Sequence, residues 1–118
     1  MELLGAAAIA PRAVVAQGAG MYGLISKLTI GPGKRDEFIA ILKESTGGMP
    51  GCLSYIVAKD AVDENAIWIT EAWDSAASHD ASLALPAVKA AIAKGRSMIA
   101  GGEKVAVTVP VVGVGQRP

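Results

Sequence analysis

The sequence is poor in the residues that bind metals and form disulfides. Among its 118 residues there are one cysteine, Cys52, and one histidine, His79. A single cysteine excludes an intrachain disulfide and a cysteine-based metal site, and no cluster of carboxylates at ligand spacing accompanies His79. Cys52 opens an apolar stretch, which favours a packing role over that of a reactive thiol. We therefore expect no metal, and a reducing, cytoplasmic location.

Excess charge of one sign and long apolar runs are also missing. Lysine plus arginine equals aspartate plus glutamate, at 11 each, so no basic surplus points to nucleic acid and no charge block points to disorder. No stretch approaches the ~18 continuous apolar residues of a membrane span. The expected partners are small molecules or a second copy of the chain, rather than nucleic acid or a membrane.

Aromatic residues are few, at five in the whole chain, although 52% of the residues are apolar. Aliphatic side chains must therefore fill the interior, and the position of each large ring carries more information than usual. A single domain of this length buries only about two-thirds of its unfolded surface. A dimer interface would therefore supply a useful second core.

Residues 1–20 differ from the rest of the chain because they are rich in alanine and glycine and are interrupted by Pro11 and Arg12. They lack the basic segment that begins a signal peptide, although a weak export signal is an open alternative. We predict a flexible or loosely docked N-terminal extension over 1–20 and one domain over 21–118.

The spacing of apolar residues predicts the element order β-α-β-β-α-β, with the second helical region in two pieces. Alternation predicts strands and a period near that of the helix predicts helices, with glycine and proline at the boundaries. The predicted strands span 22–30, 52–59, 66–73 and 103–114, and the predicted helices span 35–46, 75–83 and 86–99. We expect Thr46 on the buried face of the first helix, Asp74 as the N-cap of the second and Gly101-Gly102 as the end of the third.

This order is that of the ferredoxin-like split β-α-β arrangement, an α+β fold with one antiparallel sheet and helices on one face. The other face also carries apolar residues, which a single chain leaves uncovered. A second sheet from a partner would cover them, so we expect a homodimer in the form of a dimeric α+β barrel. Pro110 cannot donate to a ladder, which predicts that the last strand is an edge or leaves the sheet near that residue.

Alternation along 66–73 divides the two tryptophans between the two faces of the sheet. The residues that share one face are Ile67, Ile69, Glu71 and Trp73, and those that share the other are Trp68, Thr70 and Ala72. Trp68 and Trp73 therefore cannot line the same pocket.

Several motifs, in order and at matching spacing, resemble the antibiotic biosynthesis monooxygenase (ABM) family. They are Pro50-Gly51-Cys52-Leu53-Ser54-Tyr55 at the second strand, Glu71-Ala72-Trp73-Asp74-Ser75 at the end of the third, and His79 to Pro86 (HDASLALP) on the helix that follows. Met21-Tyr22-Gly23 and Gly31-Pro32-Gly33-Lys34-Arg35 resemble the family's first strand and helix start. The likeness covers roughly residues 21–110.

The resemblance implies a dimeric α+β barrel and, among the family's activities, cofactor-independent oxidation of quinols or polyphenolic aromatics with O2. The family also includes haem-degrading members and many proteins without a known substrate. The Asn, Trp and His positions of the haem-degrading branch fall on Ser26, Ser82 and near Ile92 here, which argues against haem. No flavin, nicotinamide or phosphate-binding signature is present, so we expect no cofactor.

His79 is the candidate catalytic base, because its ordinary pKa of about 6.5 suits proton transfer at neutral pH. Ser82 follows three residues later on the same helix face, so both side chains could line one wall of a pocket. Asp80 adjoins His79, but adjacent helical residues do not face each other. A surface or capping histidine is the alternative.

Besides Ser82, five further residues are candidate substrate contacts. Trp73, Tyr55 and Trp68 could stack on a planar aromatic substrate, Glu71 could be a buried acid, and Arg96 could steer an anionic substrate. Each has a structural alternative, namely core packing for the rings, an ion pair for Glu71, and contact with the carbonyls at a helix C-terminus for Arg96.

Three functions stay open from the sequence. The first is a cofactor-independent monooxygenase, which needs one titratable base in a pocket that excludes water. The second is a non-redox isomerase or cyclase on the same fold, which would turn over without O2. The third is a non-enzymatic small-aromatic-binding or stress-response barrel. A sealed apolar pocket beside His79 would favour an enzyme, and a filled interior would favour the binding protein.

Overall fold

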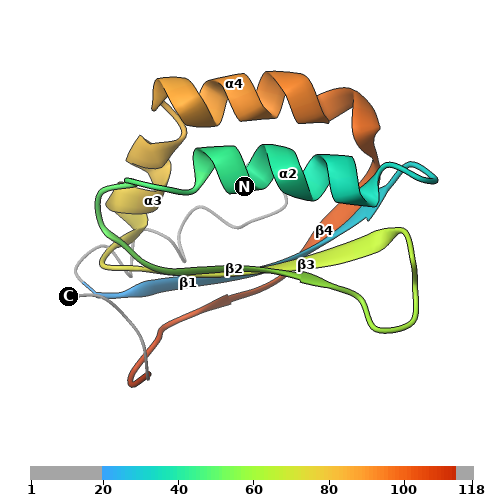
Figure 1. Ribbon diagram of the computed structural model, residues 1–118. Helices are drawn as coiled ribbons and strands as arrows, with labels where there is room; N and C mark the ends of the chain where they lie inside the picture. The colour runs from blue at the N-terminus through green and yellow to red at the C-terminus, as the bar shows by residue number, and fades with distance from the viewer. Residues whose placement is uncertain (1–19, 114–118) are drawn as a thin grey trace.

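A computed structural model of the protein describes residues 20–113. In that part of the chain, four strands form one antiparallel sheet in the order β2-β3-β1-β4. The strands are β1 (Tyr22–Ile30), β2 (Cys52–Lys59), β3 (Ala66–Trp73) and β4 (Ile99–Thr108), and the helices are α2 (Arg35–Ser45), α3 (Ala76–Ser82) and α4 (Pro86–Gly95), with a 3-10 turn η3 (Arg96–Met98). The helices lie on one side of the sheet (Figure 1). This arrangement confirms the predicted ferredoxin-like α+β fold.

The core lies between the sheet and the helices, because alternate residues of the central strands point toward the helices. On β1 these residues are Tyr22, Leu24, Ser26, Leu28 and Ile30, all fully or almost fully buried. Ile67 and Ile69 on β3 continue the same layer, and Phe38 and Leu42 of α2 cover it. Apart from Phe38, this core cluster consists of leucine and isoleucine side chains.

Helices α2 and α4 approach each other closely at Gly95. A Cβ atom at that position would lie 2.7 Å from Cε1 of Phe38, closer than such atoms pack. The glycine therefore lets the Phe38 ring lie against the backbone of α4. This contact holds α2 and α4 close together on the same side of the sheet (Figure 1).

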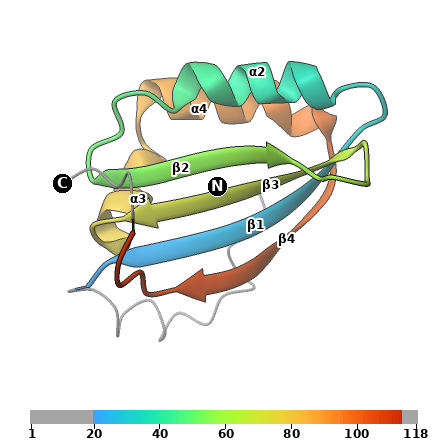
Figure 2. The same ribbon diagram turned by 60° about the horizontal axis from the view of Figure 1, so that its bottom comes forward.

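The last strand begins earlier than the sequence predicts. Gly101 and Gly102 do not end a helix but pair with Thr29 and Leu28 of β1. The prediction was wrong because local turn propensity competes with a ladder of backbone hydrogen bonds along the whole of β1, and the ladder prevails. The strand ends at Thr108, two residues before Pro110, and it is an edge strand as predicted (Figure 2).

Two local predictions for the helices were also wrong by one residue. Ser75, not Asp74, is the N-cap of α3, and its hydroxyl accepts a hydrogen bond from the backbone N–H of Ser78. Ser45 rather than Thr46 is buried at the end of α2, because the helix ends there and Thr46 is its C-cap. Both shifts follow from where the backbone leaves the helical conformation, which side-chain type alone does not specify.

The face of the sheet opposite the helices, here called the open face, carries no described helix. The residues of the open face include Ile25, Lys27, Ile56, Trp68 and Thr70, which follow from the strand register. Apart from Gly20, the predicted extension over 1–20 lies outside the described residues. No helix within residues 20–113 is long and apolar enough to cross a membrane.

Candidate functional site

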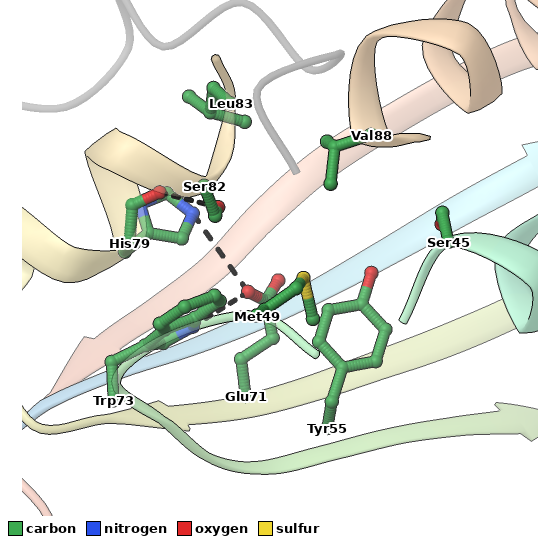
Figure 3. Close-up of a pocket in the computed structure, with 9 residues that line it drawn as sticks. All are labelled: Ser45, Met49, Tyr55, Glu71, Trp73, His79, Ser82, Leu83 and Val88. Atoms are coloured by element: carbon green, nitrogen blue, oxygen red, sulfur yellow. Dashed lines mark hydrogen bonds and ion pairs between the residues drawn. The ribbon is translucent and has the colours of Figure 1, made fainter. Parts of the chain in front are cut away.

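A small cavity lies between the sheet and the α3–α4 region (Figure 3). Its polar lining comes from the end of α2 and from β2, β3 and α3, and its apolar lining comes from the loop after α2 and from the α3–α4 region. The lining residues are Ser45, Met49, Tyr55, Glu71, Trp73, His79, Ser82, Leu83 and Val88. Helices and strands from residues 45 to 88 thus meet at this cavity.

The local structure of α3 aims His79 into this cavity. The helix starts where Ser75 caps it, and residues spaced three apart then share its inner face. Ala76, His79 and Ser82 are the buried residues of α3, and His79 is 1% exposed. The Ser82 hydroxyl donates to the carbonyl of His79 at 2.6 Å. His79 is therefore a core residue at the cavity wall, which excludes the surface alternative.

The imidazole of His79 lies between two aromatic rings and two carboxylates. The ring centroid of Tyr22 is 5.2 Å away, and that of Trp73 is 5.5 Å away with an edge-on geometry. Nε2 lies 3.8 Å from Oε1 of Glu71, and Nδ1 lies 3.5 Å from Oδ1 of Asp80. The expectation that Asp80 would not face His79 was wrong, because the two side chains lean toward each other from adjacent positions.

Glu71 is a buried carboxylate held in place by its neighbours. It is 3% exposed, and its Oε1 accepts a hydrogen bond from Nε1 of Trp73 at 3.0 Å. In Figure 3 its side chain rises from β3 toward His79. A charge-assisted bond of this kind fixes the carboxylate in a region of low dielectric, where its effect on neighbours is strong.

Tyr55 on β2 is paired with Glu71 on β3, and it lines the side of the cavity away from His79 (Figure 3). Burial raises the pKa of the Tyr55 phenol far above its ordinary value of 10.0, and the nearby charges of Glu71 and then Cys52 add to the increase. The hydroxyl therefore keeps its proton at any ordinary pH and acts as a hydrogen-bond donor, not as a base.

The cavity is small and partly open to solvent. The centre of a water-sized sphere can occupy only about 20 Å³ of it, which is room for about one water molecule. An aromatic ring would enter only if part of the wall moved. Met49, in the loop after α2, and Leu83, at the C-cap of α3, are apolar wall residues outside the sheet.

Comparison with known proteins decides the family. The profile of the family described as antibiotic biosynthesis monooxygenase, ABM, matches residues 21–94. The chain belongs to this family. None of the curated proteins compared with it matches.

Solved structures agree with this assignment. A crystal structure from Chloroflexus aurantiacus J-10-fl, described as a candidate ABM protein, is 56% identical, covers 81% of this chain and 98% of that one, and has a TM-score of 0.76. Structures from Caulobacter crescentus CB15 and Nitrosomonas europaea have the same description, identities of 22% and 16%, and a TM-score of 0.72 each. They cover 86% and 80% of this chain and 99% and 93% of their own, and they show the shared fold.

Five of the seven candidate residues named from the sequence of this ABM protein lie together at the cavity. They are Tyr55, Glu71, Trp73, His79 and Ser82. Trp68 does not join them, because it lies on the open face. Its Nε1 donates to Oδ1 of Asp60 at 2.7 Å, and the ammonium of Lys27 lies 5.3 Å from the centre of its ring. The indole donor and the amides of Asp63 and Val62 lower the pKa of Asp60 to about 2.

Arg96 is also outside the cavity. It lies in η3 on a shallow surface groove whose described lining is Lys89, Ile92, Ala93 and Arg96. The predicted helix to about 99 ends at Gly95, and Arg96 begins η3. Arg96 is not among the residues that line the His79 cavity.

Sequence reasoning missed the apolar wall and the second ring beside His79. Ser45, Met49, Leu83 and Val88 line the cavity, and Tyr22 contacts His79. A methionine between glycines and a proline, in a loop otherwise made of turn formers, was the signal available for Met49. The contact of Tyr22 required the pairing of β1 with β3. Within the described residues, no group of three or more metal-binding side chains occurs.

Proposed function

We propose that this ABM-family protein is a cofactor-independent monooxygenase that oxidises a quinol or a polyphenolic aromatic with O2. The observation that carries the proposal is the position of His79, the one histidine of the chain, buried beside the buried carboxyl group of Glu71 at a small cavity. A titratable pair at such a site is suited to general-base chemistry.

The reaction requires a base more than any other group. Triplet O2 reacts slowly with closed-shell molecules, but an electron-rich aromatic anion donates one electron and then combines with the superoxide that forms. The adduct gains a proton and loses water. For a quinol, one oxygen atom of O2 enters the ring and the other leaves as water, which takes up the two hydrogens that the quinol loses.

The side chains at the cavity divide this work between them. The pair formed by Glu71 and His79 accepts the proton of the substrate hydroxyl, because a hydroxyl between Nε2 and Oε1 would bridge their 3.8 Å separation. Tyr55 stays protonated and can donate to a second oxygen of the substrate. Trp73 offers an aromatic face, and the apolar residues keep bulk water away from the anion.

The test is oxygen consumption by the purified protein with a reduced naphthoquinone as the probe. His79→Gln should lower the rate by about 10²–10⁴-fold, the usual contribution of a general base. Glutamine keeps the volume of the side chain, so a thermal melt close to that of the wild type would show that the variant folds. Glu64→Gln, an exposed acid in the turn between β2 and β3, is the matched control and should keep full activity.

A protein-free blank is essential because hydroquinones autoxidise. Uptake equal to the blank across a panel of quinols and polyphenols would contradict the proposal. Turnover that continues without O2 would instead indicate the isomerase or cyclase alternative.

The size of the cavity favours one competing function. The cavity has room for about one water molecule in this structure. The same geometry therefore fits a binding protein whose cavity wall moves to admit a small aromatic molecule and which carries out no reaction on it. A calorimetric titration would separate the two readings, since binding of the quinone product or of an unreactive naphthalene without any oxygen uptake would support the binding protein.

We also infer that two copies of the chain associate through the open face. Ile56 is 56% exposed on this face and shares a cross-strand row with Thr70 and Ile25. A sheet face with exposed apolar residues is stabilised by a second layer, and an isologous pair of such faces supplies one.

A further inference from the structure

The two ring nitrogens of His79 face carboxylates in different surroundings. Nε2 faces Glu71, whose side chain is 1% exposed, at 3.8 Å. Nδ1 faces Asp80, whose side chain is 68% exposed, at 3.5 Å. The side chain of His79 is 2% exposed, so the imidazole stands between the cavity and an exposed carboxylate.

We propose that Asp80 is the outer end of a proton relay that connects the cavity to solvent through His79. The relay rests on the proposed function for its role in turnover, but its existence can be measured in the resting protein. Asp80 is assigned as a positioning and proton-transfer partner of His79, and it does not touch the substrate.

The burial of His79 creates the need for such a relay, because the imidazole is only 1% exposed and cannot exchange protons freely with bulk water. When the substrate hydroxyl loses its proton to a buried base, the proton can return at once and remove the reactive anion. An imidazole can instead accept a proton on Nε2 and release another from Nδ1, because its two nitrogens exchange the roles of donor and acceptor. The positive charge then does not stay beside the anion.

The proton balance closes over one turnover. As the anion forms, Nε2 takes the proton of the hydroxyl and Nδ1 gives its proton to Asp80, which passes it to water. After O2 adds, Asp80 takes a proton from water and returns one to Nδ1, while Nε2 protonates the oxygen adduct. One proton has left and one has entered, so the imidazole regains its first tautomer and no net proton is released.

Two carboxyl groups and two aromatic rings face the imidazole. Glu71 approaches from β3 and Asp80 from α3, and a carboxylate beside an imidazole favours its charged form. The rings are those of Tyr22 from β1 and Trp73 from β3. Because Asp80 is exposed, its substitution changes the charge near Nδ1 without opening the core.

The first experiment follows the imidazole signals of His79 by NMR. Since the chain has one histidine, they need no assignment against others. Asp80→Asn should lower the pKa of His79 by about 0.2–0.7 pH units, the range for an exposed ion pair, and should slow the exchange of the ring N–H with water. Asp80→Glu should restore both, and Glu64→Gln should change neither. An unchanged pKa or an unchanged exchange rate in Asp80→Asn overturns the relay.

The second experiment measures oxygen uptake with the reduced naphthoquinone. Asp80→Asn should lower kcat about tenfold with little change in KM, and added imidazole buffer should restore the rate in a concentration-dependent way. A loss that buffer does not restore overturns the relay. If the wild type itself shows no uptake above the blank, the proposed function fails, and the NMR results still decide whether Asp80 exchanges protons with His79.

Discussion

The polar side chains at the cavity are fixed by contacts that their own sequence positions provide. Glu71 is held by Trp73 two residues later on the same strand face, and His79 is held by the capped helix α3. Buried polar groups are stabilised only where such partners exist. The immediate consequence is that Glu71 and His79 are held close to each other at the cavity wall.

Tyr55 gives a pH dependence of stability that can be measured. Because its pKa in the folded state is raised above the ordinary 10.0, the unfolded chain releases the phenol proton first as pH rises, while the folded state retains it. The free energy of unfolding should therefore fall above about pH 10, by up to about 1.4 kcal/mol per pH unit. Urea unfolding of the wild type and of Tyr55→Phe between pH 8 and about 11.5 measures this.

In Tyr55→Phe the fall should be shallower, since that proton no longer distinguishes the two states. Other groups also titrate in this range, so the difference between the two proteins is the relevant quantity. Identical slopes would contradict the burial of the phenol beside Glu71.

At the scale of elements, the loop between α2 and β2 is locked against the start of α3. Gly51 has a φ of +83°, and a Cβ atom there would lie 2.5 Å from Oγ of Ser78 and 2.7 Å from Oδ1 of Asp74. The backbone N–H of Asp74 also donates to the carbonyl of Gly51 at 2.9 Å. The same loop carries Met49 to the cavity wall, so the loop connects that wall to the start of α3.

Gly51→Ala should destabilise the protein for two reasons. Alanine disfavours the left-handed backbone conformation at this position, and its Cβ atom would clash with Ser78 of α3. Gly33→Ala is the matched control, because Gly33 has a φ of +75° but nothing within 4 Å of an added Cβ. We expect a loss of about 1 kcal/mol for the control and a further 1–3 kcal/mol, roughly, for Gly51→Ala. Thermal and urea unfolding of both variants test this, and equal losses would show that the clash with α3 is relieved at no cost.

For the whole molecule, the helices protect one face of the sheet and the open face carries the inferred contact with a second copy. The cavity lies on the helix side of the sheet, whereas Trp68, Lys27 and Ile56 lie on the open face. The inferred association and the proposed chemistry therefore involve opposite faces of one sheet, and a substitution on one face can be tested without altering the other.

Ile56→Lys should convert the inferred dimer into a monomer. Two symmetry-related lysines would place like charges in an apolar contact, at a cost of several kcal/mol, so the dissociation constant should rise by about 100-fold or more. Light scattering after size exclusion measures the mass. Val62→Lys, at a 93% exposed position in the turn between β2 and β3, is the control and should not change the mass. A wild type that is monomeric at all concentrations would contradict the inference.

The sequence by itself determined the element order, the alternating faces of the strands and the family. The order and the faces depend on the period of apolar residues and on turn formers, which act over a few neighbours, and the family followed from the resemblance of several short motifs to those of ABM proteins. For that reason Glu71 with Trp73 and His79 with Ser82 were found as pairs, and Trp68 was separated from Trp73.

The tertiary structure decided the features that depend on contacts between separate elements. The early start of β4 at Ile99 follows from the ladder with β1, and Arg96 lies outside the His79 cavity. The contact of Tyr22 with His79 joins elements far apart in sequence, and the approach of His79 to Glu71 depends on how α3 folds back over β3. The position of Asp80 beside Nδ1 depends on side-chain rotamers on a short helix, which neither period nor propensity specifies.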